Sequence, residues 1–100
     1  MQPRLSLEPE AEADLSEAFS WYEDQHPGLG SEFLAEVARV LELIEQAPGR
    51  YPIIRGQMRR ALVRRFPYAI FYVIDPDLIA VTAVMHGRRD PRRWQTRDKR

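Results

Sequence analysis

Two stretches in the first half of the chain place hydrophobic residues at the spacing of an amphipathic helix. In the first stretch these residues are Ala11, Leu15, Ala18, Phe19 and Tyr22. Their period predicts a helix from about Pro9 to Gln25, with acidic residues near the positive end of the helix dipole. In the second stretch they are Phe33, Val37, Val40, Leu41 and Ile44. This stripe predicts a helix that is capped by Ser31 and stops after Ala47, where Pro48-Gly49 follows.

The segment between these two helices, His26-Pro27-Gly28-Leu29-Gly30, is rich in helix breakers. Its length suits a tight connection between neighbouring elements and is too short for a linker between domains. We therefore expect an antiparallel helical hairpin whose two apolar stripes face a common core. Trp21 falls beside the first stripe, where it either packs at the edge of the helix seam or contacts a partner.

The remaining pattern is typical of strands. Leu5 and Leu7 alternate with polar neighbours, which predicts a short N-terminal strand. Residues 59–74, RRALVRRFPYAIFYVI, predict strands at 61–63 and 69–74 with a break at Phe66-Pro67-Tyr68. After the turn sequence Asp75-Pro76-Asp77, residues 78–85 predict a last strand. The predicted fold is α+β, with the order β-α-α-β-β-β and the hairpin packed on a twisted antiparallel sheet.

Both late strands are apolar on both faces. A sheet with one wet face alternates polar and apolar residues, whereas AIFYVI and LIAVTAV do not. One helical hairpin covers only one face. The other face is therefore expected to meet the chain's own tail, a second copy of the chain or a partner peptide.

Composition narrows the possible classes of protein. A chain of 100 residues with 44% hydrophobic content predicts one domain over residues 1–100, with a core at about 3–94 and a basic tail at 86–100. The absence of a long apolar run favours a cytoplasmic protein that does not enter membranes. Because cysteine is absent and histidine occurs twice, we expect neither a metal site nor a cofactor.

The net charge of zero hides an asymmetry between the two halves of the chain. Residues 1–50 carry eleven acids and three bases, whereas residues 51–100 carry four acids and twelve bases. Such asymmetry indicates a polyanionic or acidic partner for the basic half. In the alternative interpretation, the acids coat the helices and pair with the arginines across the fold.

The basic side chains gather around the strand at 61–63 and beyond the last strand. They are Arg59, Arg60, Arg64, Arg65, Arg88 and Arg89. This set is our candidate surface for binding a target or a nucleic acid, because guanidinium groups bind phosphate and carboxylate groups in bidentate fashion. His86 adds a group that titrates near neutral pH. Together, His86, Arg60 and Arg65 predict a catalytic set only if the protein cleaves RNA, where the 2′-hydroxyl supplies the nucleophile.

The combination of these elements resembles the RelE/ParE superfamily of toxins from type II toxin-antitoxin and plasmid-stabilisation modules. The resemblance is carried by AEADLSEAFSWYE, by FLAEVARVLELIEQAPGRYP, and by RRALVRRFPYAIFYVI with the later HGRRDPRRW. It implies a growth-inhibiting toxin that a cognate antitoxin neutralises, either in a toxin-antitoxin hetero-oligomer or with a homodimeric toxin.

Within the superfamily, ParE-like members inhibit DNA gyrase and RelE-like members cleave mRNA on the ribosome. The resemblance favours the non-catalytic ParE-like action, because the carboxylate, histidine and C-terminal tyrosine set of some nuclease members is absent here. In RelE-like action, Arg60, Arg65, His86 and Arg88 would match the basic and acid-base positions. A third reading is an inert or regulatory member that only binds its antitoxin.

Overall fold

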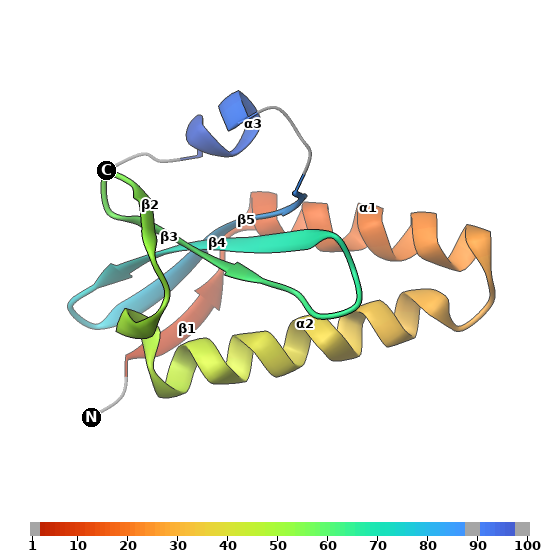
Figure 1. Ribbon diagram of the computed structural model, residues 1–100, viewed down its shortest axis with the longest axis horizontal. Helices are drawn as coiled ribbons and strands as arrows, with labels where there is room; N and C mark the ends of the chain where they lie inside the picture. Colours follow the sequence, from red (N-terminus) through yellow and green to blue (C-terminus); the bar gives the residue numbers. More distant parts are fainter. Residues whose placement is uncertain (1–2, 88–90, 98–100) are drawn as a thin grey trace.

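The computed structural model describes residues 3–87 and 91–97. Over these residues the elements are β1 (Arg4–Leu7), α1 (Pro9–Gln25), α2 (Leu29–Gln46), the 3-10 turn η1 (Pro48–Arg50), β2 (Ile53–Arg55), β3 (Met58–Leu62), β4 (Tyr68–Asp75), β5 (Leu78–His86) and α3 (Pro91–Gln95). A sheet of five strands separates the α1–α2 hairpin from the short helix α3 (Figure 1). The predicted α+β fold class is confirmed.

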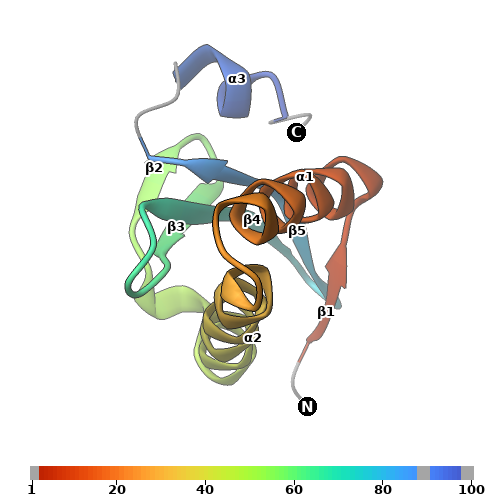
Figure 2. The same ribbon diagram turned by 90° about the vertical axis from the view of Figure 1, so that its right-hand side faces the viewer.

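The two long helices bury the stripes that their sequences predict. Helix α1 buries Ala11, Ala18 and Tyr22, and it covers the predicted range from Pro9 to Gln25. Helix α2 buries a longer row of side chains, together with one glycine: Gly30, Phe33, Val37, Val40 and Ile44. Figure 2 looks along both helix axes and shows the helices side by side. The hairpin therefore presents one apolar surface to the sheet.

The start of α2 differs from the prediction. The helix begins at Leu29, and the residue at its N-cap is Gly28 with φ 92°, so the predicted cap at Ser31 is wrong. The carboxylate of Glu23 on α1 caps the N-terminus of α2, because it accepts hydrogen bonds from the backbone N–H groups of Gly28 at 3.0 Å and Gly30 at 2.8 Å. A negative group at this point also complements the helix dipole. One helix of the hairpin thus caps the other.

Gly30 lets the two helices approach closely. A β-carbon at this position would lie 2.7 Å from the main-chain oxygen of Phe19 and 2.8 Å from Cγ of Glu23. Real side chains do not tolerate such distances. The glycine therefore sets the separation of α1 and α2 at the turn of the hairpin.

The strands are ordered β1-β5-β4-β3-β2 in the sheet. Strands β3, β4 and β5 pair in antiparallel fashion as predicted, and β2 pairs with β3 in the same way. Strand β1 pairs with β5 in parallel, with Arg4 opposite Leu78 and Leu7 opposite Val81. Strand β2, only three residues long, was not predicted because Pro52 and Gly56 flank it. Between β4 and β5 the register shifts at Phe71 and Tyr72, which leaves one extra residue in β5.

Two hydrophobic clusters occupy the two faces of the sheet. The larger cluster lies under α1 and α2, and it includes Tyr72, which is fully buried and donates a hydrogen bond of 2.5 Å to the carbonyl oxygen of Pro48. The smaller cluster consists of Met58, Ala69, Phe71, Val73, Ala83 and Met85. Helix α3 packs on this second cluster, where Trp94 stacks on Phe71 with ring centroids 4.9 Å apart. The chain's own tail therefore covers part of the face that the sequence left unassigned.

Candidate functional site

Arg59, the first of the predicted basic residues, supports the fold. Strand alternation puts it on the hairpin face, and its guanidinium donates hydrogen bonds to the backbone oxygens of Gly49 at 3.1 Å and Tyr51 at 2.6 Å. These carbonyl groups lie in and just after the 3-10 turn η1. Arg59 therefore holds the segment between α2 and β2 in place. Because its guanidinium already makes these two hydrogen bonds, it is less available to a partner than a solvated arginine.

Arg65 lies in the loop between β3 and β4, where it is the one non-glycine residue with positive φ in the described part of the chain, at 70°. Its guanidinium pairs with Glu32 at 2.9 Å and Glu36 at 3.6 Å, both on α2, and lies over the ring of Phe66. The hydrogen bond with Glu32 is the main cause that raises the pKa of Arg65 above its ordinary value. For this residue the interpretation that acids and arginines pair across the fold holds.

Arg60 in β3 and Arg64 just after it are exposed, and among the described residues neither guanidinium has a hydrogen bond or ion pair of the kind that holds Arg59 and Arg65. Arg60 shares a strand face with buried Met58 and exposed Leu62, each two residues away, so it lies on the α3 face of the sheet. Leu62 is 66% exposed, the largest fraction among the exposed large hydrophobic residues of the described chain. The exposed surface at this strand end thus combines two cations with an apolar side chain.

His86 ends β5 and belongs to the opposite face of the sheet. It shares a strand face with Val84 of the hairpin-side cluster, and its ring lies 5.5 Å from the ring of Tyr68. Arg60 lies two strands across and three residues along from His86, about 14 Å away between Cα atoms. The structure therefore does not bring His86 and Arg60 together. The predicted positions Arg88 and Arg89 lie outside the described residues.

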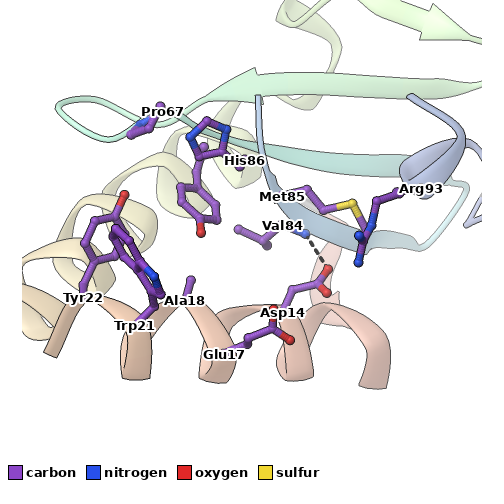
Figure 3. A pocket seen from close by; sticks show the side chains of 11 residues that line it. Asp14, Glu17, Ala18, Trp21, Tyr22, Pro67, Val84, Met85, His86 and Arg93 are labelled. Atoms are coloured by element: carbon purple, nitrogen blue, oxygen red, sulfur yellow. Dashed lines mark hydrogen bonds between the residues drawn. The ribbon is translucent and has the colours of Figure 1, made fainter. Parts of the chain in front are cut away.

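His86 instead lines a cavity of about 470 Å³ between α1 and the end of β5 (Figure 3). The volume of this cavity is similar to that of pockets that bind small ligands. Aromatic side chains surround one end of it. They are Trp21, Tyr22, Tyr68 and His86. Charged side chains line the other end: Asp14, Glu17 and Arg93. Of these residues, the sequence analysis named only His86 and Trp21 as candidates for a functional contact. For Trp21 the signal was its position beside the apolar stripe.

Asp14 completes the edge of β5 beyond the point where β1 ends. Its Oδ2 atom accepts a hydrogen bond of 3.0 Å from the backbone N–H of Val84. Arg97, after α3, pairs with both oxygens of Asp14 at 3.0 and 3.3 Å and also donates to the backbone oxygen of Thr82 at 3.0 Å. The edge of a strand exposes backbone N–H and C=O groups, and here the side chains of Asp14 and Arg97, from distant segments, form hydrogen bonds with two of them.

The described residues offer little for metal or membrane chemistry. In residues 3–87 and 91–97, no three histidine or acidic side chains are grouped closely enough to hold a metal ion. None of the helices in the same residues combines the length and the apolar character that a membrane span requires. What the arrangement offers is an exposed basic strand end on one side of the sheet and an aromatic, charged cavity on the other.

Comparison with known proteins identifies the family. The family described as "ParE toxin of type II toxin-antitoxin system, parDE" matches residues 5–91 of this chain. The chain belongs to the ParE toxin family. Toxin ParE2 of Mycobacterium tuberculosis, from strains CDC 1551 / Oshkosh and ATCC 25618 / H37Rv, is 33% identical over 92 residues, which cover 91% of this chain and 88% of that toxin.

A solved structure agrees with this ParE family assignment at the level of the fold. It is described as "Chromosomal ParDE TA system from P. aeruginosa", and it superposes with a TM-score of 0.77 over 85% of this chain and 96% of that chain. Its identity to the present ParE toxin is 15%, so the likeness concerns the fold alone. The resemblance seen in the sequence is confirmed, and this ParE toxin is the toxin component of a type II toxin-antitoxin module.

Proposed function

We propose that this ParE toxin acts in the cytoplasm by binding and inhibiting DNA gyrase, without catalysis, until a cognate antitoxin neutralises it. The gyrase target comes from the resemblance to ParE-like members. One observation carries the non-catalytic action: Arg60 and His86 lie on opposite faces of the sheet. Cleavage of RNA requires an acid-base group and cations around one phosphorus atom, and these two residues do not provide that arrangement.

The contact with the target is assigned to the end of β3. Arg60 and Arg64 are exposed there on either side of Leu62, whereas Arg59 and Arg65 are bound to groups of the toxin itself. Arginine is enriched among the residues that dominate protein interfaces, and an apolar neighbour that is desolvated on binding strengthens its contribution. The proposed contact therefore consists of two arginines and one leucine.

Inhibition of gyrase supercoiling by the purified toxin tests this proposal. We expect the wild-type toxin to inhibit at micromolar concentration, and the double variant Arg60→Glu/Arg64→Glu to need at least about tenfold more protein. The matched control is Arg39→Glu, which reverses an exposed arginine on α2. Failure of the wild-type toxin to inhibit gyrase would remove the gyrase target, and equal losses in the variant and the control would remove the proposed contact.

The two remaining readings have their own assays. Codon-spaced cuts in translated mRNA, seen by primer extension and lost in both His86→Ala and Arg65→Ala, would replace gyrase inhibition by RelE-like cleavage. Unchanged growth after induction of the toxin without antitoxin would leave only the inert or regulatory reading. We expect neither result.

A further inference from the structure

The loop between β3 and β4, residues 63–67, carries one of the two arginines in the proposed target contact. This arginine, Arg64, is exposed and lies two residues beyond Leu62 at the end of β3. Val63 and Phe66, on either side of the two loop arginines, are buried in the hairpin-side cluster. The direction in which Arg64 extends therefore depends on how the chain turns between these two buried residues.

The chain makes this turn at Arg65, whose φ angle of 70° lies in the left-handed region. A residue with a β-carbon adopts this conformation at a cost in free energy that glycine avoids. Glycine would therefore make the turn more easily. An arginine in this strained position indicates that its side chain has a use that offsets the strain.

The contacts between Arg65 and α2 show what that use is. The guanidinium lies 2.9 Å from the carboxylate of Glu32 and 3.6 Å from that of Glu36, and it lies over the ring of Phe66 at 5.5 Å. The side chain of Glu36 is 13% exposed, so water and salt screen this second pair less than a fully exposed one. Arg65 therefore ties the middle of the loop to two successive turns of α2.

These ion pairs act on the loop more than on the stability of the whole domain. Ion pairs near the surface contribute little to the free energy of folding. The two ends of the loop have their own anchors, because the backbone N–H of Val63 donates to the oxygen of Tyr68 at 2.9 Å and that of Gly87 donates to the oxygen of Pro67 at 2.7 Å. The two loop arginines lie between these anchors, where the pairs with α2 restrain the chain.

We propose that Arg65 is a positioning residue for the target contact, because its pairs with Glu32 and Glu36 hold the loop in the conformation that presents Arg64. This inference rests on the gyrase contact in the proposed function. Arg65 acts through Arg64 and does not touch the target itself. A surface that is held in its binding conformation before association loses less conformational freedom on binding, and this raises the affinity.

The first test releases Arg65 without changing it. The double variant Glu32→Gln/Glu36→Gln removes both carboxylates that hold the guanidinium. We expect gyrase inhibition to weaken about fivefold, because the loop then samples more conformations. The matched control Glu42→Gln/Glu45→Gln removes two charges from the last turns of α2 and should leave inhibition unchanged. Inhibition that stays equal or becomes stronger in the first variant would overturn the proposal, because a released Arg65 would then be free to bind the target directly.

A charge exchange tests the same pair from the other side. Arg65→Glu places a third carboxylate beside Glu32 and Glu36 and should weaken inhibition at least about tenfold. Adding Glu32→Arg restores an ion pair with the signs exchanged, and it should recover most of the lost inhibition. No recovery would show that the positive charge of Arg65 is needed at the target, which would overturn a positioning role.

NMR of the free toxin measures the loop itself. In the full-length ¹⁵N-labelled toxin, the order parameter of the Arg64 amide should fall from about 0.85 to below about 0.6 in Glu32→Gln/Glu36→Gln and stay unchanged in the control variant. The melting temperature should fall by less than about 5 °C. An unchanged order parameter would make the two acids direct contacts, and a larger fall in melting temperature would make the effect one of stability; either result would overturn the proposal.

The outcomes separate this inference from the proposed function. If the wild-type toxin does not inhibit gyrase, the proposed function fails, and the contact that Arg65 would position fails with it. If the wild-type toxin inhibits gyrase and Glu32→Gln/Glu36→Gln inhibits equally well, the gyrase target stands and only the positioning role of Arg65 is overturned.

Discussion

Replacement of Gly30 by alanine tests whether the close approach of α1 and α2 defines the hairpin. Alanine has a higher helix propensity than glycine, which by itself would stabilise the first turn of α2 by up to about 1 kcal/mol. The added methyl group would, however, lie 2.7 Å from the main-chain oxygen of Phe19. A main-chain atom cannot rotate away as a side chain can, so the two helices must separate.

The cost of that separation exceeds the gain in propensity. Overpacking a tight contact destabilises a protein by about 1–3 kcal/mol. The shift also stretches the hydrogen bonds from Gly28 and Gly30 to the carboxylate of Glu23, and loss of a helix cap costs about 0.5–2 kcal/mol. Gly30→Ala should therefore destabilise the domain by about 1–3 kcal/mol in net terms, which lowers the melting temperature by about 5–20 °C for a chain of this size.

Thermal and urea unfolding followed by circular dichroism measure this loss. The control is Ser31→Ala, the exposed neighbour in the same turn, which should be neutral or slightly stabilising. Adding Phe19→Ala to Gly30→Ala removes a ring contact but leaves the main-chain oxygen in place, and it should not restore stability. A Gly30→Ala domain as stable as the wild type, or a rescue by Phe19→Ala, would refute the argument.

Two further predictions concern the sheet. Phe71→Ala should lower the free energy of unfolding in urea by about 3–5 kcal/mol, because the ring is 2% exposed. Trp94→Ala, on the five-residue helix α3, should lower it by about 1 kcal/mol. Equal losses in the two variants would contradict this difference. Burial raises the pKa of Tyr72 to about 12 from its ordinary value of 10. The unfolded tyrosine therefore loses its proton first, so this contribution to stability is complete below pH 10 and is lost as the pH rises towards 12. The free energy of unfolding, measured with urea at a series of pH values, should fall less steeply with pH for Tyr72→Phe than for the wild type over that window. The same slope in both proteins would rule out Tyr72 as the cause.

Local sequence patterns predicted those elements whose limits are set by residues close by in the sequence. The limits of α1 follow from its period and from the proline at its start, and the turn at Pro76 follows from the φ angle that proline imposes. Helix α2 began earlier than predicted because Glu23, from a different helix, caps it. The parallel pairing of β1 with β5 was missed for a similar reason, since alternation predicts a strand without the direction of its neighbour.

The candidate site was harder to predict because similar arginines have different partners. Arg59 and Arg60 are adjacent in the sequence, yet one fastens η1 and the other faces solvent on the far side of the sheet. Arg65 pairs with acids that precede it by about thirty residues. The cavity was invisible in the sequence, because Asp14 and Trp21 meet His86 only after α1 folds across the end of β5. Such contacts depend on topology, which no local pattern contains.

The pairing of β1 with β5 also sets the time at which the toxin is complete during its synthesis. The first strand remains without its neighbour until residues 78–81 have been made, and the buried residues Ile79, Val81 and Val84 of the larger cluster arrive with that strand. Contacts between such distant residues form slowly, because a long loop must close first. A nascent chain that stops before Leu78 therefore holds the helical hairpin without a finished sheet, and the toxin fold is complete only after β5 has been made.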